Sequence, residues 1–418
     1  MGRLPQVDTR GAATFIIAAP NSYNKNRADF IIKSGSVNAE QVINKAIDML
    51  PAAGGKIRLL EGSYIVSAPI QLKDYTFLHG LGDTSRITIP DGLNADINII
   101  ENIDSTGGNS YIFIEDLRID LNKVNQTSGT MKGIYFYNIA RSDVASCQVH
   151  NATENGIHIE GGSRTRIRDN NCHDNDGSGL LVTNSGDAAI TGNYAYNNGN
   201  HGIELDNLNQ TIFCDNNLSY NNSVSGIVFA NSDRGALREN SCRDNGDKGI
   251  VLYQAHKINV NANYCHDNGT FGINTIQSDH GIFNGNSCIA NTESGFVIDN
   301  CEGDNIENNK AIENQQHGFW VISSLDCNMV GNLSHGNSQA ASDSYDNIRC
   351  TGTAGSPTSN NMIQCNSCRH ENYARYGLYM GTNTDHNQIT NNDLLNSGLS
   401  DDLQDNGTLN KNQAGNRV

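Results

Sequence analysis

Apolar residues recur in the middle of this chain at a spacing far longer than that of one helix or one strand. Glycines stand 23 residues apart, or 24 once, and an Ile, Leu or Phe follows each of them. The series is Gly133, Gly156, Gly179, Gly202, Gly226, Gly249, Gly272, Gly295 and Gly318. A second apolar residue stands eleven residues after each glycine from Gly156 onward, as at Ile167 and Val260. This regularity indicates a solenoid built from one repeated structural unit.

Each period predicts two or three short β-strands that are separated by turns. Side chains alternate across a strand, so the recurring Gly-Ile-x-Ile pattern places its apolar residues inside and x outside. Successive coils would then pair as parallel strands about 4.8 Å apart. We therefore expect an all-β fold, a right-handed parallel β-helix with coils of about 23 residues.

Two further positions repeat in register with the glycines. Asparagine stands nine residues before the glycine in eight successive coils: Asn170, Asn193, Asn217, Asn240, Asn263, Asn286, Asn309 and Asn332. Asparagine tolerates left-handed backbone, and stacked amides can bond to each other, so we expect a ladder at one bend. Seven residues before the glycine is a small inward position that holds Cys172, Cys242, Cys265 and Cys288. Cysteines stacked on parallel strands point the same way, so we expect buried thiols rather than disulfides.

The two ends of the chain depart from the repeat. Residues 37–55 carry apolar groups at helical spacing and end at Gly54-Gly55, which predicts a short amphipathic helix. Such a helix would cap the open end of the solenoid and cover its strand edges. Residues 1–36 would be an N-terminal extension, residues 56–398 the β-helix and residues 399–418 a polar tail, all within a single domain.

Composition and charge narrow the range of partners. The 45 acidic and 28 basic residues leave a net charge of −17, which disfavours nucleic acids and anionic membranes. The same charge disfavours an acidic sugar unless a cation or a local basic patch offsets it. No apolar run approaches the roughly 20 residues that span a bilayer, and no clear signal peptide precedes the repeat. The sequence names no compartment, and an extracellular or virion-associated location is compatible with it.

The outward positions next to the glycines hold a local group of polar and aromatic residues. They lie one residue before a glycine, or two or four residues after it, on the strand that we predict there. The group comprises Tyr135, Tyr137, His158, Glu160, Thr183, His201, Glu204 and Asp206. Farther along the chain the same column holds Val228, Val251 and Val297. A merely solvated face would be polar along its whole length, so the local group predicts a functional site.

A second outward column lies six or five residues before the glycines. Its aromatic or long polar members are His150, His173, Tyr196, Tyr220, Arg243 and His266. Aromatic and polar side chains of this kind are typical of a surface that binds sugars. We therefore predict that every member of the column from His173 onward contacts the substrate. The same positions also recur because they belong to turns, so a structural role stays open.

Two stretches outside the repeat, QVINKAIDMLPAAGGKIRLLEGSYIVS and LRIDLNKVNQTSG, lead into the glycine series. With them the chain resembles the catalytic modules of mannuronan C5-epimerases and the wider pectate-lyase-like group, over roughly residues 28–340. Many β-helix proteins share such a cap and such repeats. The resemblance therefore implies the fold more than an activity.

The resemblance also implies the place of a site. In these epimerases an Asp-Pro-His triplet follows the glycine of the coil that matches Gly156. Here His158 takes the place of the aspartate and Glu160 that of the histidine, while His201 matches a histidine two coils later. Three other positions of the family pattern, an aspartate, a tyrosine and a basic residue, are occupied by Thr183, Asn155 and Asn200. The resemblance thus implies where a site lies more than which reaction occurs there.

The leading functional hypothesis is a polysaccharide lyase or C5-epimerase that acts on a uronate-containing glycan. Such chemistry removes the proton α to a carboxylate, and His158 and His201 are suited to exchange protons. Tyr135 or Tyr137 would serve as acid or as sugar platform. A group that neutralises the carboxylate is missing from this column apart from Lys132. A Ca²⁺ ion held by Glu160, Glu204 or Asp206 would fill that role.

Two other classes of function remain open. A glycoside hydrolase would use Glu204 and Asp206, which project from one strand about 7 Å apart, together with Glu160. A non-catalytic glycan-binding or structural β-helix, such as a phage tail fibre or a cell-surface protein, is the third hypothesis. A monomer would argue against the fibre, whereas a homotrimer would use an exposed apolar strip such as that formed by Val228, Val251 and Val297.

Overall fold

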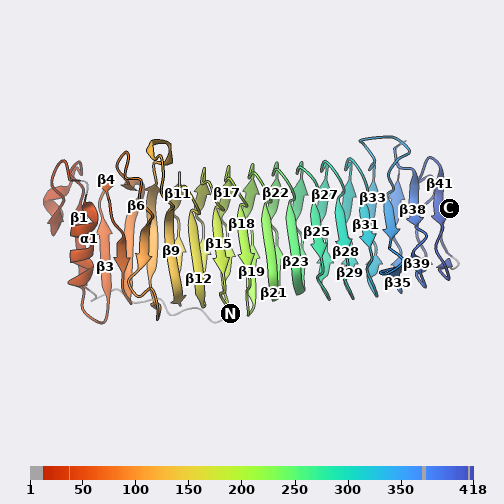
Figure 1. Ribbon diagram of the computed structural model, residues 1–418, viewed down its shortest axis with the longest axis horizontal. Helices are drawn as coiled ribbons and strands as arrows, with labels where there is room; N and C mark the ends of the chain where they lie inside the picture. Colours follow the sequence, from red (N-terminus) through yellow and green to blue (C-terminus); the bar gives the residue numbers. More distant parts are fainter. Residues whose placement is uncertain (1–12, 37, 370–372, 413–414) are drawn as a thin grey trace. The chain divides into compact units, whose positions relative to one another are not determined.

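The computed structural model describes residues 13–36, 38–369, 373–412 and 415–418 (Figure 1). These residues divide into two compact units, Met1–Phe213 and Cys214–Val418. We call them unit 1 and unit 2 and describe each by itself. No helix among the residues that the structure describes is long and apolar enough to cross a membrane.

The coils of unit 1 contribute strands to three parallel sheets. We number the sheets in the order in which one coil, counted from its periodic glycine, passes through them. Sheet 1 contains β5 (Ile70–Leu72), β7 (Ile97–Asn102), β9 (Met131–Ala140), β12 (Ile157–Ser163), β15 (Leu180–Thr183) and β18 (Ile203–Asp206). Sheet 2 contains β1 (Ala13–Ala18), β3 (Gly55–Leu59), β6 (Thr76–Thr88), β8 (Phe113–Asp120), β10 (Asp143–Ala145), β13 (Arg166–Arg168) and β16 (Ala189–Thr191). Sheet 3 contains β4 (Gly62–Ile65), the second halves of β6 and β8, β11 (Gln148–His150), β14 (Asn171–His173) and β17 (Tyr194–Tyr196).

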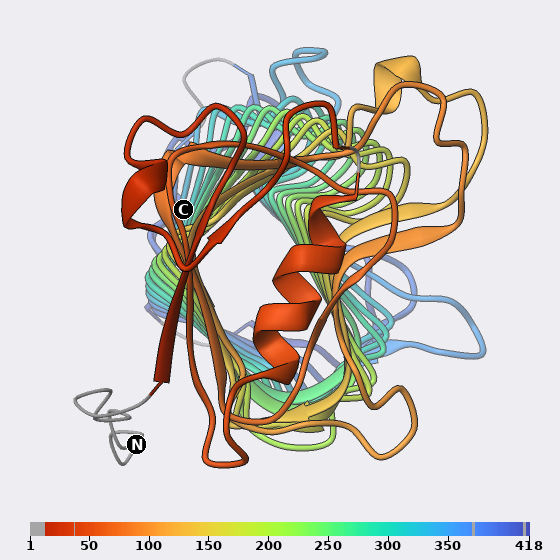
Figure 2. The same cartoon turned by 90° about the vertical axis from the view of Figure 1, so that its left-hand side faces the viewer.

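The first coils of unit 1 carry the only α-helix of the described chain, α1 (Ala39–Asp48), inside the predicted segment 37–55. Its apolar face, which includes Ile43 and Ile47, is fully buried, and Figure 2 shows the helix lying across the open end of these coils. Strand β1 pairs with β3, so pairing begins before the predicted start of the β-helix at residue 56. The remaining short elements here are β2 (Phe30–Ile31), η1 (Lys25–Arg27) and η2 (Lys123–Asn125). Residues 1–12 of the predicted extension lie outside the described ranges.

Unit 2 repeats the three-sheet pattern. Its sheet 1 contains β21 (Ile227–Arg238), β23 (Ile250–Asn261), β25 (Ile273–Ile276), β28 (Phe296–Asp299), β31 (Phe319–Ile322), β34 (Ile348–Thr351), β38 (Tyr376–Met380) and β41 (Asp401–Asp405). Sheet 2 continues along β21 and β23 into β26 (Ile282–Asn284), β29 (Asn305–Glu307), β32 (Asn328–Val330), β36 (Met362–Gln364), β40 (Gln388–Thr390) and β42 (Lys411–Asn412). Sheet 3 contains β20 (Leu218–Tyr220), β22 (Ser241–Arg243), β24 (Tyr264–His266), β27 (Ser287–Ile289), β30 (Lys310–Ile312), β33 (Leu333–His335) and β37 (Ser367–Arg369).

Three short strands stand apart from these sheets or at their limits. β35 (Thr358–Ser359) and β39 (Thr384–Asp385) pair with each other, and β19 (Ile212–Asp215) runs across the junction of the units in the sequence. β41 and β42 lie within residues 399–418, which we expected to form a polar tail. Pairing therefore extends beyond the predicted limits of the β-helix at both ends. The predicted fold class, an all-β right-handed parallel β-helix, is confirmed.

The periodic glycines stand where a coil presses on its neighbour. A Cβ at Gly156 would lie 2.7 Å from the carbonyl oxygen of Gly179 and 2.8 Å from the amide nitrogen of Asn175. A Cβ at Gly249 would lie 2.6 Å from the Gly272 oxygen. Real Cβ contacts are not this short, so the 23-residue glycine spacing follows from close approach of backbone to backbone.

The predicted asparagine ladder is confirmed in both units. In unit 1 the Asn170 amide nitrogen donates to the Asn193 oxygen at 3.0 Å, and in unit 2 the contacts from Asn240 to Asn332 repeat this geometry at 2.9–3.1 Å. The structure adds a second ladder at the bend after sheet 3, where Asn175 donates to Asn198 at 3.0 Å. Its members in unit 2 are Asn222, Asn245, Asn268, Asn291, Asn314 and Asn337.

The cysteines behave as predicted. All 11 are free thiols, and every one except Cys365 is buried. Burial raises the pKa of the Cys147 thiol to about 12 and raises that of the Cys242 thiol as well. They therefore serve as small apolar residues of the core.

Candidate functional site

The predicted polar group lies on the outer face of sheet 1 in unit 1. Pairing in register sets Tyr135, His158, Leu181 and Glu204 side by side across β9, β12, β15 and β18. A second row, two residues farther along each strand, holds Tyr137, Glu160, Thr183 and Asp206. The 23-residue period thus brings residues from four coils onto one surface, which we call the sheet-1 face.

A tyrosine and a carboxylate form the first contact of this face. The Tyr135 hydroxyl donates a hydrogen bond to Glu160 Oε2 at 2.8 Å. Partial burial, followed by the hydrogen bond to Glu160, raises the pKa of the Tyr135 hydroxyl far above its usual value of 10. Lys132 Nζ lies 5.1 Å from the centre of the Tyr135 ring and forms an ion pair with Glu154 at 3.1 Å. The tyrosine therefore stays protonated at neutral pH and can act as a proton donor.

His158 packs edge-on against Tyr135, with 5.2 Å between the ring centres. The side chain is nearly buried although it points outward, since only 9% of the residue is exposed. Its Nε2 lies 3.4 Å from Thr183 Oγ1, and its buried Nδ1 has no hydrogen-bond partner among the residues that the structure describes. Burial, with a smaller contribution from Lys132, lowers the pKa of His158 to about 4. The imidazole is therefore neutral at pH 7 and able to accept a proton.

The remaining predicted catalytic residues, His201, Glu204 and Asp206, lie two coils away from His158 and Glu160. Glu204 accepts a hydrogen bond from the Ser178 hydroxyl at 2.8 Å, and Asn200 donates to the same hydroxyl at 3.2 Å. The backbone carbonyl of His201 accepts a hydrogen bond at 3.0 Å from the N–H of Gly179, the residue before β15. Two coils correspond to about 10 Å, so Glu204 and Asp206 form a separate group from Tyr135, His158 and Glu160.

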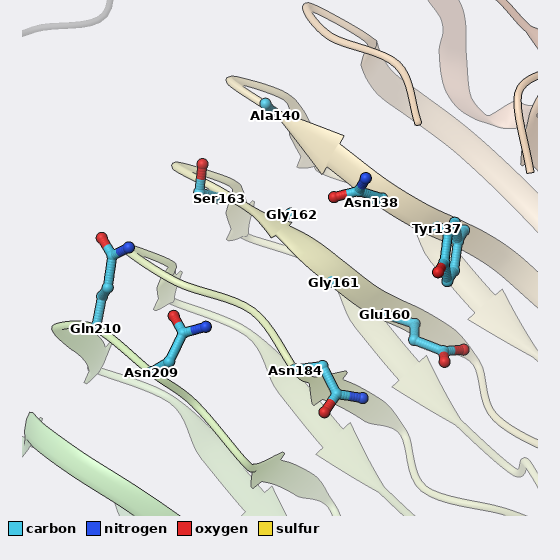
Figure 3. Close-up of a pocket in the computed structure, with 10 residues that line it drawn as sticks. All are labelled: Tyr137, Asn138, Ala140, Glu160, Gly161, Gly162, Ser163, Asn184, Asn209 and Gln210. Carbon is cyan, nitrogen blue, oxygen red and sulfur yellow. The ribbon is translucent and has the colours of Figure 1, made fainter. Parts of the chain in front are cut away.

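A pocket of about 590 Å³ opens beside the first group, at the end of the sheet-1 face where the chain turns toward sheet 2. Figure 3 shows its lining residues: Tyr137, Asn138, Ala140, Glu160, Gly161, Gly162, Ser163, Asn184, Asn209 and Gln210. Only Tyr137 and Glu160 of this set were predicted as site residues. Gly162 has a φ of +87°, and a Cβ there would lie 1.8 Å from the Ile139 oxygen, so the pocket floor requires glycine. The Gly161-Gly162 pair is the sequence signal that could have indicated this pocket.

The second predicted column lies on sheet 3, where its rings stack on one another. In unit 1 the His173 ring stacks between those of His150 and Tyr196, with centres 4.9 and 4.8 Å away. His173 is 9% exposed, and its Nδ1 contacts an Asp174 oxygen at 2.6 Å. In unit 2 the Arg243 guanidinium lies 4.5 Å from the Tyr220 ring centre, and His266 Nδ1 lies 2.7 Å from Asp267. These contacts leave mainly ring edges to solvent, and sugar binding by this column stays a prediction.

One group of three residues in the described ranges places metal-type ligand atoms together: His79, Glu115 and Asp116. Their ligand atoms lie within 4.8 Å of one another, and His79 Nε2 is 3.4 Å from Asp116. Arg168 lies 3.7 Å from Glu115, and Lys56 also acts electrostatically on these groups. Because cations already neutralise it, this cluster is a salt-bridge network. A Ca²⁺ ion at Glu160, Glu204 or Asp206 stays a prediction.

Comparisons with known proteins agree on the fold. The family model described as "Right handed beta helix region" matches residues 93–224 and 209–349, whereas comparison with curated proteins gives no match. Among solved structures, the A-modules of two Azotobacter vinelandii mannuronan C-5 epimerases, AlgE4 and AlgE6, are similar to this chain. They are 21% and 18% identical, with TM-scores of 0.59 and 0.58, and the matches cover 90% and 92% of this chain and 96% and 97% of theirs.

A protein of bacteriophage phi29 has a similar structure as well. The N-terminal fragment of its gene product 12 is 16% identical with a TM-score of 0.55, and the match covers 86% of this chain and 64% of that fragment. Identities this low show a shared fold. A shared fold does not imply a shared function, because function depends on the residues of the particular site.

Proposed function

Because the chain belongs to the right-handed beta helix family, we propose that it is a polysaccharide-active protein whose glycan lies along the sheet-1 face of unit 1. The observation that carries the proposal is the contact of Tyr135, His158 and Glu160 at the edge of the pocket. A pocket of about 590 Å³ lies in the range of sites that hold small ligands, here one or a few sugar units. The A-modules with the same fold are named as mannuronan epimerases, which agrees with a glycan as substrate.

The most specific form of the proposal is a polysaccharide lyase or C5-epimerase that acts on a uronate-containing glycan. Both reactions begin when a base removes the proton α to the sugar carboxylate. The neutral imidazole of His158 is the base in this scheme, and the protonated Tyr135 is the acid. In an epimerase the acid returns a proton to the opposite side of the same carbon, and in a lyase it protonates the leaving glycosidic oxygen.

Glu160 completes this scheme by holding Tyr135 in place. Its carboxylate accepts the Tyr135 hydrogen bond and also lines the pocket. A carboxylate of this kind fixes the position of the hydroxyl oxygen and keeps the tyrosine protonated until its proton is transferred to the sugar. His201, Glu204 and Asp206 would contact the glycan farther along the same face.

A glycoside hydrolase is the second candidate. Glu204 and Asp206 project from β18 two residues apart, about 7 Å, which falls within the range of carboxylate pairs that activate water. A non-catalytic glycan-binding or structural protein is the third. Val297, which an exposed apolar strip for trimer formation would need, is only 3% exposed, and this disfavours such a strip in its part of unit 2.

One experiment separates these candidates. The protein is incubated in D2O with oligomers of several polyuronates and of neutral glycans, with and without Ca²⁺. The masses of the products are then measured by mass spectrometry. Shorter unsaturated chains indicate a lyase, deuterium gained without cleavage an epimerase, and water-added fragments a hydrolase. We expect the first or second outcome, and we expect His158→Gln to abolish it.

The controls decide what a negative result means. His386→Gln changes a half-exposed histidine near the end of unit 2 and should leave any activity intact. If no glycan changes with wild-type protein at any Ca²⁺ concentration, the catalytic proposal is wrong and the non-catalytic role is the better account. If His386→Gln and His158→Gln reduce activity equally, the proposed site is misplaced.

A further inference from the structure

Four successive coils of unit 1 place large side chains one above another at the bend from sheet 1 to sheet 2. These residues are Tyr75, Tyr111, Arg141 and Arg164, which we call the bend column. The backbone N–H of each of these residues donates a hydrogen bond to a carbonyl of the next coil. In the first, Tyr75 donates to Ser110 at 3.1 Å, and in the last, Arg164 donates to Gly186 at 3.0 Å. The column thus follows the coil stacking of the solenoid.

The side chains of the bend column also stack. The rings of Tyr75 and Tyr111 lie nearly parallel with centres 4.9 Å apart, and the Arg141 guanidinium lies 5.6 Å from the Tyr111 ring centre. Tyr75 is 46% exposed, and the side chain of Arg164 is 57% exposed. Stacking holds the planar Arg141 group in a defined orientation at the surface, unlike a lysine on a flexible stem.

The backbone conformation at these positions is one that large side chains rarely adopt. All four residues have a φ between 53° and 60°, in the left-handed region. Asn138 and Asn184, in neighbouring bends of the same unit, have the same conformation with the residue type that tolerates it best. The same conformation recurs at bends of unit 2, for example at Arg234 and Lys257, so it belongs to the coil geometry and fixes where these side chains leave the backbone.

The arginines of the bend column each directly follow a residue that lines the pocket. Ala140 and Ser163 line the pocket and directly precede Arg141 and Arg164 in the sequence, and Figure 3 shows both at the bend end of their strands. No carboxylate within the described ranges lies within 4.0 Å of the Arg141 guanidinium, and Arg164 Nε is 4.0 Å from its nearest acidic partner, Asp187. Arg141, without such a carboxylate, and Arg164, with one at 4.0 Å, therefore place positive charge next to pocket-lining residues in a chain whose net charge is −17.

We propose that Arg141 and Arg164 bind sugar carboxylates, and that the ligand of this pocket is therefore an acidic, uronate-containing glycan. The inference rests on the proposed function and adds to it the two residues that bind the carboxylates of the substrate. A guanidinium donates two parallel hydrogen bonds to a carboxylate, and arginines on successive coils stand about 4.8 Å apart. The bend column thereby supplies the local basic patch without which this acidic chain would repel an acidic sugar.

The test replaces both arginines by asparagine, a residue that suits the left-handed backbone. The affinity of Arg141→Asn/Arg164→Asn for oligomers of polygalacturonate and polymannuronate is measured by calorimetry at low salt. A mannan oligomer of equal length is the neutral ligand. We expect affinity for the better-bound polyuronate to fall at least tenfold and any affinity for mannan to stay unchanged. The melting temperature should stay equal or rise, because asparagine relieves backbone strain.

A matched control removes two charges elsewhere. Arg234 and Lys257 in unit 2 are exposed residues with φ of 69° and 58°, eight residues after their glycines as Arg141 and Arg164 are after theirs. Arg234→Asn/Lys257→Asn should retain wild-type affinity. Equal losses in both double variants would show non-specific charge attraction and would overturn the proposal.

The remaining outcomes distinguish this inference from the proposed function. If the wild-type protein binds polyuronates and the unit 1 double variant binds them equally well, the arginine site is wrong while a glycan-active protein stands. The same conclusion follows if wild-type protein binds mannan alone. If no oligomer, acidic or neutral, binds, the inference and the proposed function fail together.

Discussion

The hydrogen bond between the Tyr135 hydroxyl and the Glu160 carboxylate should matter more for activity than for stability. Their hydrogen bond lies on the outer surface, so Tyr135→Phe should change the free energy of unfolding by no more than about 1–2 kcal/mol. The same change removes the proposed acid and should lower turnover of a polyuronate by about 100-fold or more. Urea unfolding and the mass-spectrometric assay measure the two quantities. Full activity of Tyr135→Phe would rule out Tyr135 as the acid.

His158 gives a prediction about pH at the same scale. Its pKa is about 4 in the folded protein, below the usual 6.5, because burial disfavours the charged form. Between pH 6.5 and pH 4 the unfolded chain therefore binds a proton that the folded chain does not. Stability should fall as pH is lowered through this window, by up to about 3 kcal/mol, and this contribution should not change further below pH 4.

The measurement for His158 compares wild type with His158→Gln by urea unfolding at pH 7 and pH 4. The variant should lose less stability than wild type over this interval, whereas His386→Gln should behave as wild type does. An NMR titration of the imidazole gives the pKa directly. A His158 that titrates near pH 6.5 would contradict the burial that the structure shows.

At the scale of elements, the second asparagine ladder joins the coils of unit 1. Asn175 is 1% exposed, accepts from the Ala152 N–H at 3.0 Å and donates to Asn198 at 3.0 Å. Asn175→Ala leaves the buried Ala152 N–H without this acceptor and removes the side-chain donor to Asn198, so we expect a loss of about 2–4 kcal/mol in unfolding free energy. Asn171→Ala, at an outward asparagine of β14, is the control and should cost under about 1 kcal/mol. Equal losses would mean that the ladder does not contribute specifically.

Close coil packing gives a second prediction for the elements. Gly156→Ala would place a Cβ 2.7 Å from the Gly179 oxygen, so the coils must shift, at a cost of about 1–3 kcal/mol. Gly355→Ala meets no atom within 4 Å and should be neutral within about 0.5 kcal/mol. Thermal unfolding of both variants tests the difference. A Gly156→Ala protein as stable as wild type would show that the coils separate more easily than their contacts indicate.

At the scale of the whole molecule, the state of the cysteines is a direct test of the core. Native protein should react with a thiol reagent at one position, the exposed Cys365, and denatured protein at all 11. Cys365→Ser should abolish the native reaction. Fewer than 11 reactive thiols after denaturation without a reductant would reveal disulfides and contradict the stacking of free cysteines on parallel strands.

Much of the candidate site was predictable because the repeat assigns residues to columns. Tyr135, His158 and Glu160 come together because their coils pair in register. The arginines of the bend column were missed although their signal is periodic: Arg141 and Arg164 each stand eight residues after a glycine. A column at a bend gives no alternation of apolar and polar residues, so the strand pattern does not reveal it.

The sequence by itself determined the solenoid, because a 23-residue period in glycine, asparagine and apolar residues fits only coils that stack in register. It also determined which side chains point outward, because alternation along a strand is a local property. Only the tertiary structure decided which outward residues are covered: His158 is 9% exposed and Val297 is 3% exposed. The pocket likewise depends on the left-handed bends at Gly161-Gly162. Burial and cavities depend on how neighbouring coils and bends meet in space, and no local pattern of residue types contains that information.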